Sequence, residues 1–138
     1  MGLRRRRWSV SKINWDDYPN FSKLEFDCKH TGRNEMKPEF LAKLQELRTA
    51  LGFPFIISSG YRDPSHPVEA RKPRPGQHSQ GIACDIQCRD GATAFRLVQK
   101  ALELGFTGVG VAQDNRRGRA SRFVHLDIRT TTPVMWSY

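Results

Sequence analysis

Residues 77–87 have the sequence QHSQGIACDIQ, in which a polar turn with one glycine leads into an alternating apolar segment. We expect a strand over residues 82–88, because successive side chains of a strand point to opposite faces of a sheet. Asp85 falls on the face opposite the apolar one, so Asp85 and His78, which lies in the preceding turn, are candidate metal ligands. The apolar face of this strand consists of Ile82, Cys84 and Ile86.

The length of 138 residues fits one domain with a single hydrophobic core. We expect that domain over residues 21–138, behind a basic and loosely ordered lead-in over residues 1–20. No apolar run reaches the roughly 18 residues that a membrane span requires. The N-terminal positive charge is not followed by an apolar segment, which predicts synthesis in the cytoplasm without a secretory signal.

Basic residues dominate the charge, with 23 Lys and Arg against 14 Asp and Glu and a net charge of +9. Such a charge favours polyanionic partners, namely nucleic acid, acidic membranes or an anionic cell wall. A basic nucleic-acid-binding protein is therefore one alternative, although we expect no specific nucleic-acid partner. The basic clusters fall in segments predicted to be tail or loop, at Arg4–Arg7, Arg71–Arg74 and Arg116–Arg122.

The order of the predicted elements indicates an α+β fold with a small, mostly antiparallel sheet and two main helices. Pro38 suits a first helical turn and Gly52 a helix end, while Asp90 suits the N-cap of the second helix. The long polar segment between the first two strands is a predicted functional loop. The elements are a helix over 38–51, a strand over 53–60, a loop over 61–77, a strand over 82–88, a helix over 91–105 and strands within 106–112 and 123–129.

The last of these strands, FVHLDIR, repeats the division between an apolar and a polar face. Val124, Leu126 and Ile128 share one face, so that His125 and Asp127 point away from the core. Two strands would then each direct a metal-capable side chain to the same side of the sheet. With His78 from the turn, they provide two histidines and one aspartate, a plausible set for zinc with its fourth position open to water.

The cysteines offer a competing metal site. Cys28, Cys84 and Cys88 are too few and odd in number for a disulfide framework, which favours a reduced compartment. Together with His30 they could form a closed Cys3His structural site. Buried, unreactive thiols are the simpler interpretation, because Cys84 points to the apolar face.

Three motifs in order resemble the family of zinc D-Ala-D-Ala carboxypeptidases and L-alanyl-D-glutamate murein endopeptidases, whose fold is shared with the hedgehog signalling domain. They are SSGYR at 58–62, HSQGIACD at 78–85 and FVHLDIR at 123–129. The similarity extends from Phe26 to Arg129. It implies a hedgehog/DD-peptidase-like fold.

Residue by residue, the resemblance implies that His78, Asp85 and His125 are the ligands of a Zn²⁺ ion. Arg62 corresponds to the cation that holds a carbonyl or carboxylate of the substrate and stabilises the oxyanion. Its neighbour Tyr61 is a candidate substrate-binding residue, with a packing role as the alternative.

Two positions depart from the family pattern. The serine expected two residues before the first histidine is Gly76, and the acidic general base expected three residues before the last histidine is Arg122. Asp127 is the best substitute for that base, because it shares a strand face with His125. An orienting role for Asp127, on a ligand or on an arginine, is equally consistent with the sequence. Weaker candidates for the base in the long loop are His66 and Glu69.

The resemblance implies a monomeric zinc peptidase that hydrolyses bonds involving D-amino acids in the stem peptides of peptidoglycan. It favours a phage-lysin-like enzyme, either a carboxypeptidase or an endopeptidase, that acts on the cell wall or is associated with the virion. The alternative within the same fold is a zinc-bound binding module without catalytic activity, because the customary base is missing.

Overall fold

The computed structural model describes residues 8–9, 12–113 and 122–138. The basic cluster Arg4–Arg7, the predicted turn over residues 114–121 and most of the cluster Arg116–Arg122 lie outside the described residues. No helix in the described ranges is long and apolar enough to cross a membrane.

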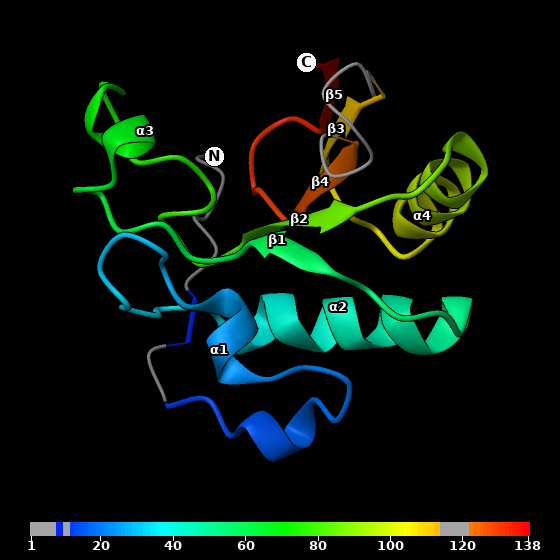
Figure 1. The fold of residues 1–138 in the computed structure, drawn as a ribbon, viewed down its shortest axis with the longest axis horizontal. Coiled ribbons are helices and arrows are strands. Elements are labelled where there is room, and N and C mark those ends of the chain that lie inside the picture. Colours follow the sequence, from blue (N-terminus) through cyan, green and yellow to red (C-terminus); the bar gives the residue numbers. More distant parts are fainter. Residues whose placement is uncertain (1–7, 10–11, 114–121) are drawn as a thin grey trace, which may run out of the picture.

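The described strands form one five-stranded sheet in the order β1-β2-β4-β3-β5 (Figure 1). The pairs β1–β2, β2–β4 and β3–β4 are antiparallel, and β5 adds to β3 in parallel at one edge. The α+β class and the mostly antiparallel sheet are therefore confirmed. The strands are β1 (Ile57–Ser59), β2 (Ala83–Gln87), β3 (Gly108–Ala112), β4 (Phe123–Asp127) and β5 (Val134–Ser137).

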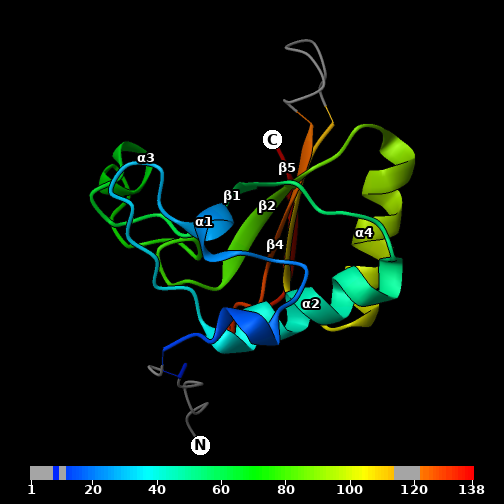
Figure 2. The same ribbon diagram turned by 60° about the horizontal axis from the view of Figure 1, so that its bottom comes forward.

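In the described part of the chain, two long helices and three short ones accompany the sheet. The first long helix ends at Gly52 as expected, where the backbone has a left-handed φ of 75°. The second begins after Asp90 as expected, and the Asp90 side chain caps it by accepting from Thr93 N. Figure 2 shows these two helices together beside the sheet. The helices are η1 (Trp15–Asp17), α1 (Lys23–Phe26), α2 (Pro38–Leu51), α3 (Pro67–Ala70) and α4 (Gly91–Glu103).

The hydrophobic core lies between the sheet and the helices α2 and α4. One face of the strands contributes side chains that are at most 1% exposed, and α2 and α4 contribute side chains that are fully buried. Burial of this contiguous apolar surface is the main stabilising contribution to the fold. The strand residues of the core are Cys84, Ile86, Val109, Val124 and Leu126, and the helix residues are Phe40, Leu41, Leu44, Leu47, Leu97 and Ala101.

Besides the short helices η1 and α1, which were not expected, three elements after α2 differ from the expectation. β1 covers three residues where eight were expected, and its register with β2 shifts between Ile57 and Ser59. The loop over residues 61–77 contains the one-turn helix α3, with Pro67 at its start and His66 as its cap. β5 was not expected, because an edge strand with only one half-buried residue shows little apolar alternation.

Part of the predicted lead-in packs on the domain. Trp15 lies 5.6 Å from Phe26 between ring centroids, and Tyr18 is buried against the core. The predicted boundary at residue 21 stays a prediction, with these aromatic residues on its N-terminal side already in contact with the fold.

Gly81 gives a prediction about stability, because it has a φ of 75° and an added Cβ would overlap the carbonyl oxygen of Glu35. Gly52 has the same φ of 75°, but an added Cβ there would meet nothing within 4 Å. We expect Gly52→Ala to lower the free energy of unfolding by about 1 kcal/mol and Gly81→Ala by clearly more, because only the latter adds a backbone clash to the strain. Urea denaturation measures both. Equal losses for the two variants would contradict the close approach of residues 35 and 81.

Candidate metal centre

Three segments bring together the residues predicted to bind metal. Asp85 of β2 and His125 of β4 are direct partners in the antiparallel register, so their side chains stand next to each other on the face turned away from the helices. His78 comes from the turn before β2. Gly81 adopts a left-handed conformation in this turn and lies against the backbone of Glu35 and Met36.

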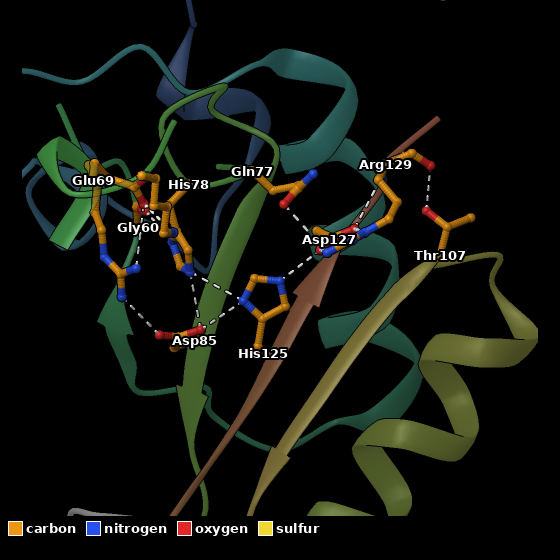
Figure 3. A network of polar contacts seen from close by, with 11 residues as sticks. Gly60, Glu69, Gln77, His78, Asp85, Thr107, His125, Asp127 and Arg129 are labelled. Atoms are coloured by element: carbon orange, nitrogen blue, oxygen red, sulfur yellow. Dashed lines mark hydrogen bonds and ion pairs between the residues drawn. The ribbon is translucent and has the colours of Figure 1, made fainter. Parts of the chain in front are cut away.

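The three facing atoms form a nearly equilateral triangle (Figure 3). His78 Nε2 lies 3.2 Å from His125 Nδ1 and 3.3 Å from Asp85 Oδ1, and the last two atoms are 3.1 Å apart. All three residues are buried, with 4–6% of their surface exposed. A buried cluster of two imidazoles and one carboxylate could hold a metal ion. Among the described residues, no other group of three or more His, Cys, Asp or Glu side chains is arranged so that it could do so.

The second nitrogen of each imidazole faces a hydrogen-bond acceptor. His78 Nδ1 lies 2.8 Å from the carbonyl oxygen of Gly60, and His125 Nε2 lies 2.7 Å from Asp127 Oδ2. With a proton on each of these nitrogens, His78 turns its Nε2 lone pair and His125 its Nδ1 lone pair to the cluster. Such partners fix the ring orientation and the tautomer of histidines that bind metal.

Gly108 on β3 leaves the space in which the Asp127 side chain lies. Gly108 is the partner of Asp127 in the register, and a Cβ at Gly108 would overlap the carboxylate. Asp127 is fully buried and also accepts from Arg129, whose Nε and Nη2 lie 3.0 and 2.7 Å from the two carboxylate oxygens. This bidentate pair leaves Asp127 behind His125, on the side away from the triangle.

The charges of these residues shift one another's pKa. Burial acts to raise the pKa of Asp85, but the imidazoles of His125 and His78 donate hydrogen bonds to its carboxylate when they are protonated at both nitrogens, and this outweighs burial, so the pKa falls below its usual value. Burial acts to lower the pKa of His125, but its contacts with Asp127 and Asp85 outweigh that effect and raise the pKa. For Asp127, burial raises the pKa, yet the hydrogen bonds from His125 and Arg129 bring it down to about 2.

Arg62 lies beside the triangle and is held between two carboxylates. Its Nη2 is 3.4 Å from Asp85 Oδ2 and its Nη1 is 3.7 Å from Glu69 Oε1, with 22% of the side chain exposed. Glu69 is buried and also accepts from Lys72 Nζ and from Gly76 N, each at 3.1 Å. The carboxylate of Glu69 therefore closes the loop over residues 61–77 and supports Arg62.

A cleft of about 430 Å³ opens onto the triangle. Its lining combines the metal-capable residues with cationic and aromatic side chains. Among the described residues that line the cleft, Asp85 is the single carboxylate. The lining residues are Arg62, Val68, Lys72, Gln77, His78, Asp85, Phe123, His125, Arg129, Trp136 and Tyr138.

Other residues singled out from the sequence lie elsewhere. Tyr61 is 2% exposed, and its hydroxyl donates to Glu35 Oε2 at 2.7 Å, so it packs beside the site rather than lining the cleft. His66 caps α3 by accepting from Val68 N. Arg122 donates to the carbonyl oxygen of Gln113 and does not line the cleft.

The position of Asp127 fits the orienting role that the sequence left open rather than that of a general base. Both of its oxygens are already engaged by His125 and Arg129, and it does not line the cleft. Within the described part of the chain, no metal-capable group unites Cys28, Cys84 and Cys88. The Cys3His alternative is therefore not supported.

The strand alternation placed Phe123 on the face of His125, but sequence reasoning missed Trp136 and Tyr138 beside it and the acceptor role of Gly60. Phe123, Trp136 and Tyr138 line the cleft from β4 and from the end of the chain. A signal was present, because Gly108 and Gly110 recur on one face of a strand and each leaves room for a large neighbour. The identity of those neighbours depends on the strand register, which the sequence did not give.

The fold and the cluster define a small α+β protein with a buried His–Asp–His group that could bind metal, set in a cleft beside an arginine. A family model for Peptidase M15 matches residues 19–127, which is most of the chain. The chain belongs to the Peptidase M15 family, which confirms the resemblance drawn from the three motifs and indicates a metal-dependent peptidase. Among curated proteins, no match to the chain was found.

The lowered pKa of Asp127 gives a prediction for the metal-free protein. Because the pKa of about 2 lies below the usual 3.8, the carboxylate stabilises the fold by about 2 kcal/mol above pH 4, and this contribution is lost as the pH falls towards 2. We expect Asp127→Asn to lower the free energy of unfolding by about that amount at pH 7, with a smaller difference from wild type near pH 3. Urea denaturation in a chelator at both pH values measures this. The control is Asp16→Asn, a substitution at an exposed position, whose free energy of unfolding should stay within about 0.5 kcal/mol of wild type at both pH values. An effect of Asp127→Asn that does not depend on pH would contradict the lowered pKa of Asp127.

Proposed function

We propose that the protein is a zinc peptidase that hydrolyses peptide bonds involving D-amino acids in the stem peptides of bacterial peptidoglycan. The observation that carries the proposal is the triangle of His78, Asp85 and His125 at the floor of a cleft, with Arg62 at its edge. Membership of the Peptidase M15 family supports the reaction class. The triangle supports the choice of metal.

The size of the triangle fits zinc. Bonds of about 2.0–2.1 Å to a tetrahedral zinc ion separate neighbouring ligand atoms by roughly 3.3–3.4 Å. The observed separations of 3.1–3.3 Å are close to this value before any adjustment on binding. Two neutral imidazoles and one carboxylate are also a ligand set typical of catalytic zinc, with a fourth position left for water.

A bound zinc ion supplies a Lewis acid and lowers the pKa of a bound water from 15.7 towards about 7. Arg62 contributes a guanidinium that can donate to the carbonyl or carboxylate of the substrate next to the triangle. Glu69 and Asp85 hold this guanidinium from two sides, which limits the entropy that it loses when substrate binds. His78 and His125 keep their orientation through Gly60 and Asp127.

The lining of the cleft also favours the second candidate, a zinc-bound binding module without catalytic activity. Among the described residues that line the cleft, the single carboxylate is Asp85, which belongs to the triangle itself. The position that would supply an acidic base is occupied by Arg122, whose side chain bonds to Gln113. If the protein hydrolyses a substrate, the proton acceptor is therefore not a second carboxylate in the lining of the cleft. A measurement of hydrolysis separates the two candidates.

The substrate part of the proposal rests on the family and on charge. A net charge of +9 favours association with an anionic cell wall. We place the protein among phage-lysin-like enzymes that act on the wall or are associated with the virion. The cations Arg62, Lys72 and Arg129 around the cleft suit a peptide that carries carboxylates.

Digestion of purified peptidoglycan tests the proposal, with the released muropeptides identified by mass spectrometry. We expect hydrolysis that is lost in a zinc chelator and restored by Zn²⁺, and that is abolished in His78→Ala. Arg62→Lys should lower kcat/KM by about 10²–10³-fold, because a point charge cannot reproduce a preorganised donor pair. The matched control is Arg96→Lys on α4, where the arginine stacks on Phe53 away from the cleft.

Zinc bound at one equivalent without any released amine would overturn the peptidase and leave the binding module. Hydrolysis that persists in the chelator would overturn the role of the metal. Mass spectrometry of the products also identifies the scissile bond, since a carboxypeptidase releases a single C-terminal D-amino acid and an endopeptidase separates longer peptides.

A further inference from the structure

The indole of Trp136 lies on bare backbone of the neighbouring strand. Gly110 of β3 is paired with Trp136 of β5 on one side and with His125 of β4 on the other. A Cβ at Gly110 would come within 2.5–2.8 Å of three atoms of the indole. Glycine at this position therefore lets the ring reach across β3, where its centroid lies 4.9 Å from that of the His125 imidazole.

A second contact connects Trp136 to the same histidine by a longer route. The guanidinium carbon of Arg129 lies 5.1 Å from the centroid of the indole, a cation–π distance. Arg129 donates to both oxygens of Asp127, and Asp127 faces His125 Nε2 at 2.7 Å. The four side chains thus form a closed ring in which each contacts the next.

We propose that Trp136 is a positioning residue that fixes the plane of His125 directly and fixes its Asp127 partner through Arg129. The inference rests on the proposed function, because its consequence is a preorganised zinc ligand. An imidazole can rotate about its bond to Cβ, and a rotation would move Nδ1 away from Asp85 and His78. The hydrogen bond to Asp127 opposes this rotation at the ring edge, and the contact with the indole, which is tilted by 52° to the imidazole, opposes it from the side of β5.

Arg129 also connects this ring of side chains to the turn that carries the other histidine. Its Nη2 lies 3.4 Å from the Oε1 of Gln77, the residue that precedes His78. Displacement of the indole should therefore loosen the triangle on two sides. Loss of such outer partners typically lowers metal affinity by about 10–100-fold.

The test is a zinc competition titration of the 138-residue chain against a chromophoric chelator. We expect Trp136→Ala to weaken zinc binding by about 10-fold or more, and Trp136→Phe to recover most of the affinity because it keeps an aromatic face. Gly110→Ala should weaken binding in the same way, because it displaces an indole that is still present. The matched controls are Met135→Ala, the exposed neighbour on β5, and Gly91→Ala, where a Cβ meets only Gln113 Nε2 at 3.7 Å.

The visible absorption of the Co²⁺-loaded protein gives a readout that simple loss of stability would not move. A change of band position or intensity in Trp136→Ala and Gly110→Ala, with the wild-type spectrum in the controls and near-recovery in Trp136→Phe, supports the positioning role. Circular dichroism confirms that each variant is folded. Because removal of an indole can unfold a small domain, Gly110→Ala decides the question if Trp136→Ala does not fold.

Three outcomes separate this inference from the proposed function. A wild-type protein that binds zinc but hydrolyses no peptidoglycan overturns the peptidase while the titration of the variants still decides the inference. Variants that match the controls in both affinity and spectrum overturn the role of Trp136 and leave the peptidase intact. A wild-type protein that takes up no zinc overturns both.

Discussion

The pairing of Asp85 with His125 across β2 and β4 is the constraint on which the site depends. These residues are direct partners in the register, so the fold brings a carboxylate and an imidazole to 3.1 Å inside a buried face. If β2 slipped by one residue relative to β4, the side chains of β2 would exchange faces and Asp85 would point to the face that packs on the helices. The apolar residues Cys84 and Leu126, which alternate with Asp85 and His125, oppose such a shift because they are fully buried in the core. The packing of the core and the geometry of the site therefore depend on the same register between β2 and β4.

Burial of so many polar groups requires that each be paired, and the structure meets this requirement outward from the triangle. Asp85 faces both imidazoles, and each imidazole has an acceptor for its other nitrogen at Gly60 or Asp127. Asp127 in turn is held by Arg129. A buried carboxylate without partners would be costly, whereas a complete network orders the site before substrate or metal arrives.

The sequence predicted the parts of this arrangement that repeat with a local period. Alternation along residues 82–88 and within FVHLDIR placed Asp85, His125 and Asp127 on the polar side, and helical spacing placed α2 and α4. The spacing of the histidines and aspartates alone is a moderate signal for a metal site, and the three ordered motifs strengthen it. Proximity of the side chains required the strand register, which local patterns do not contain.

Tertiary partners decided the roles that the sequence left ambiguous. Asp127 shares a strand face with His125, which is compatible with a base or an orienting group. The choice depends on Arg129 and on the space left by Gly108, and both become evident only when β3 and β4 are side by side. Likewise, Glu69 is a weaker candidate for the general base by sequence, but its burial and its contact with Gly76 make it the residue that closes the loop over residues 61–77.

The glycine-rich strand β3 connects these observations. A strand with glycine at alternate positions loses side-chain packing on one face, which by itself weakens a sheet. Here the vacant space at Gly108 is filled by the Asp127 carboxylate, and that at Gly110 by the indole of Trp136. Both of these groups contact His125. The packing that β3 loses at its glycines is thus offset by the two groups that fill the space and contact the His125 imidazole. In this way β3 shapes the site without contributing a side chain to it.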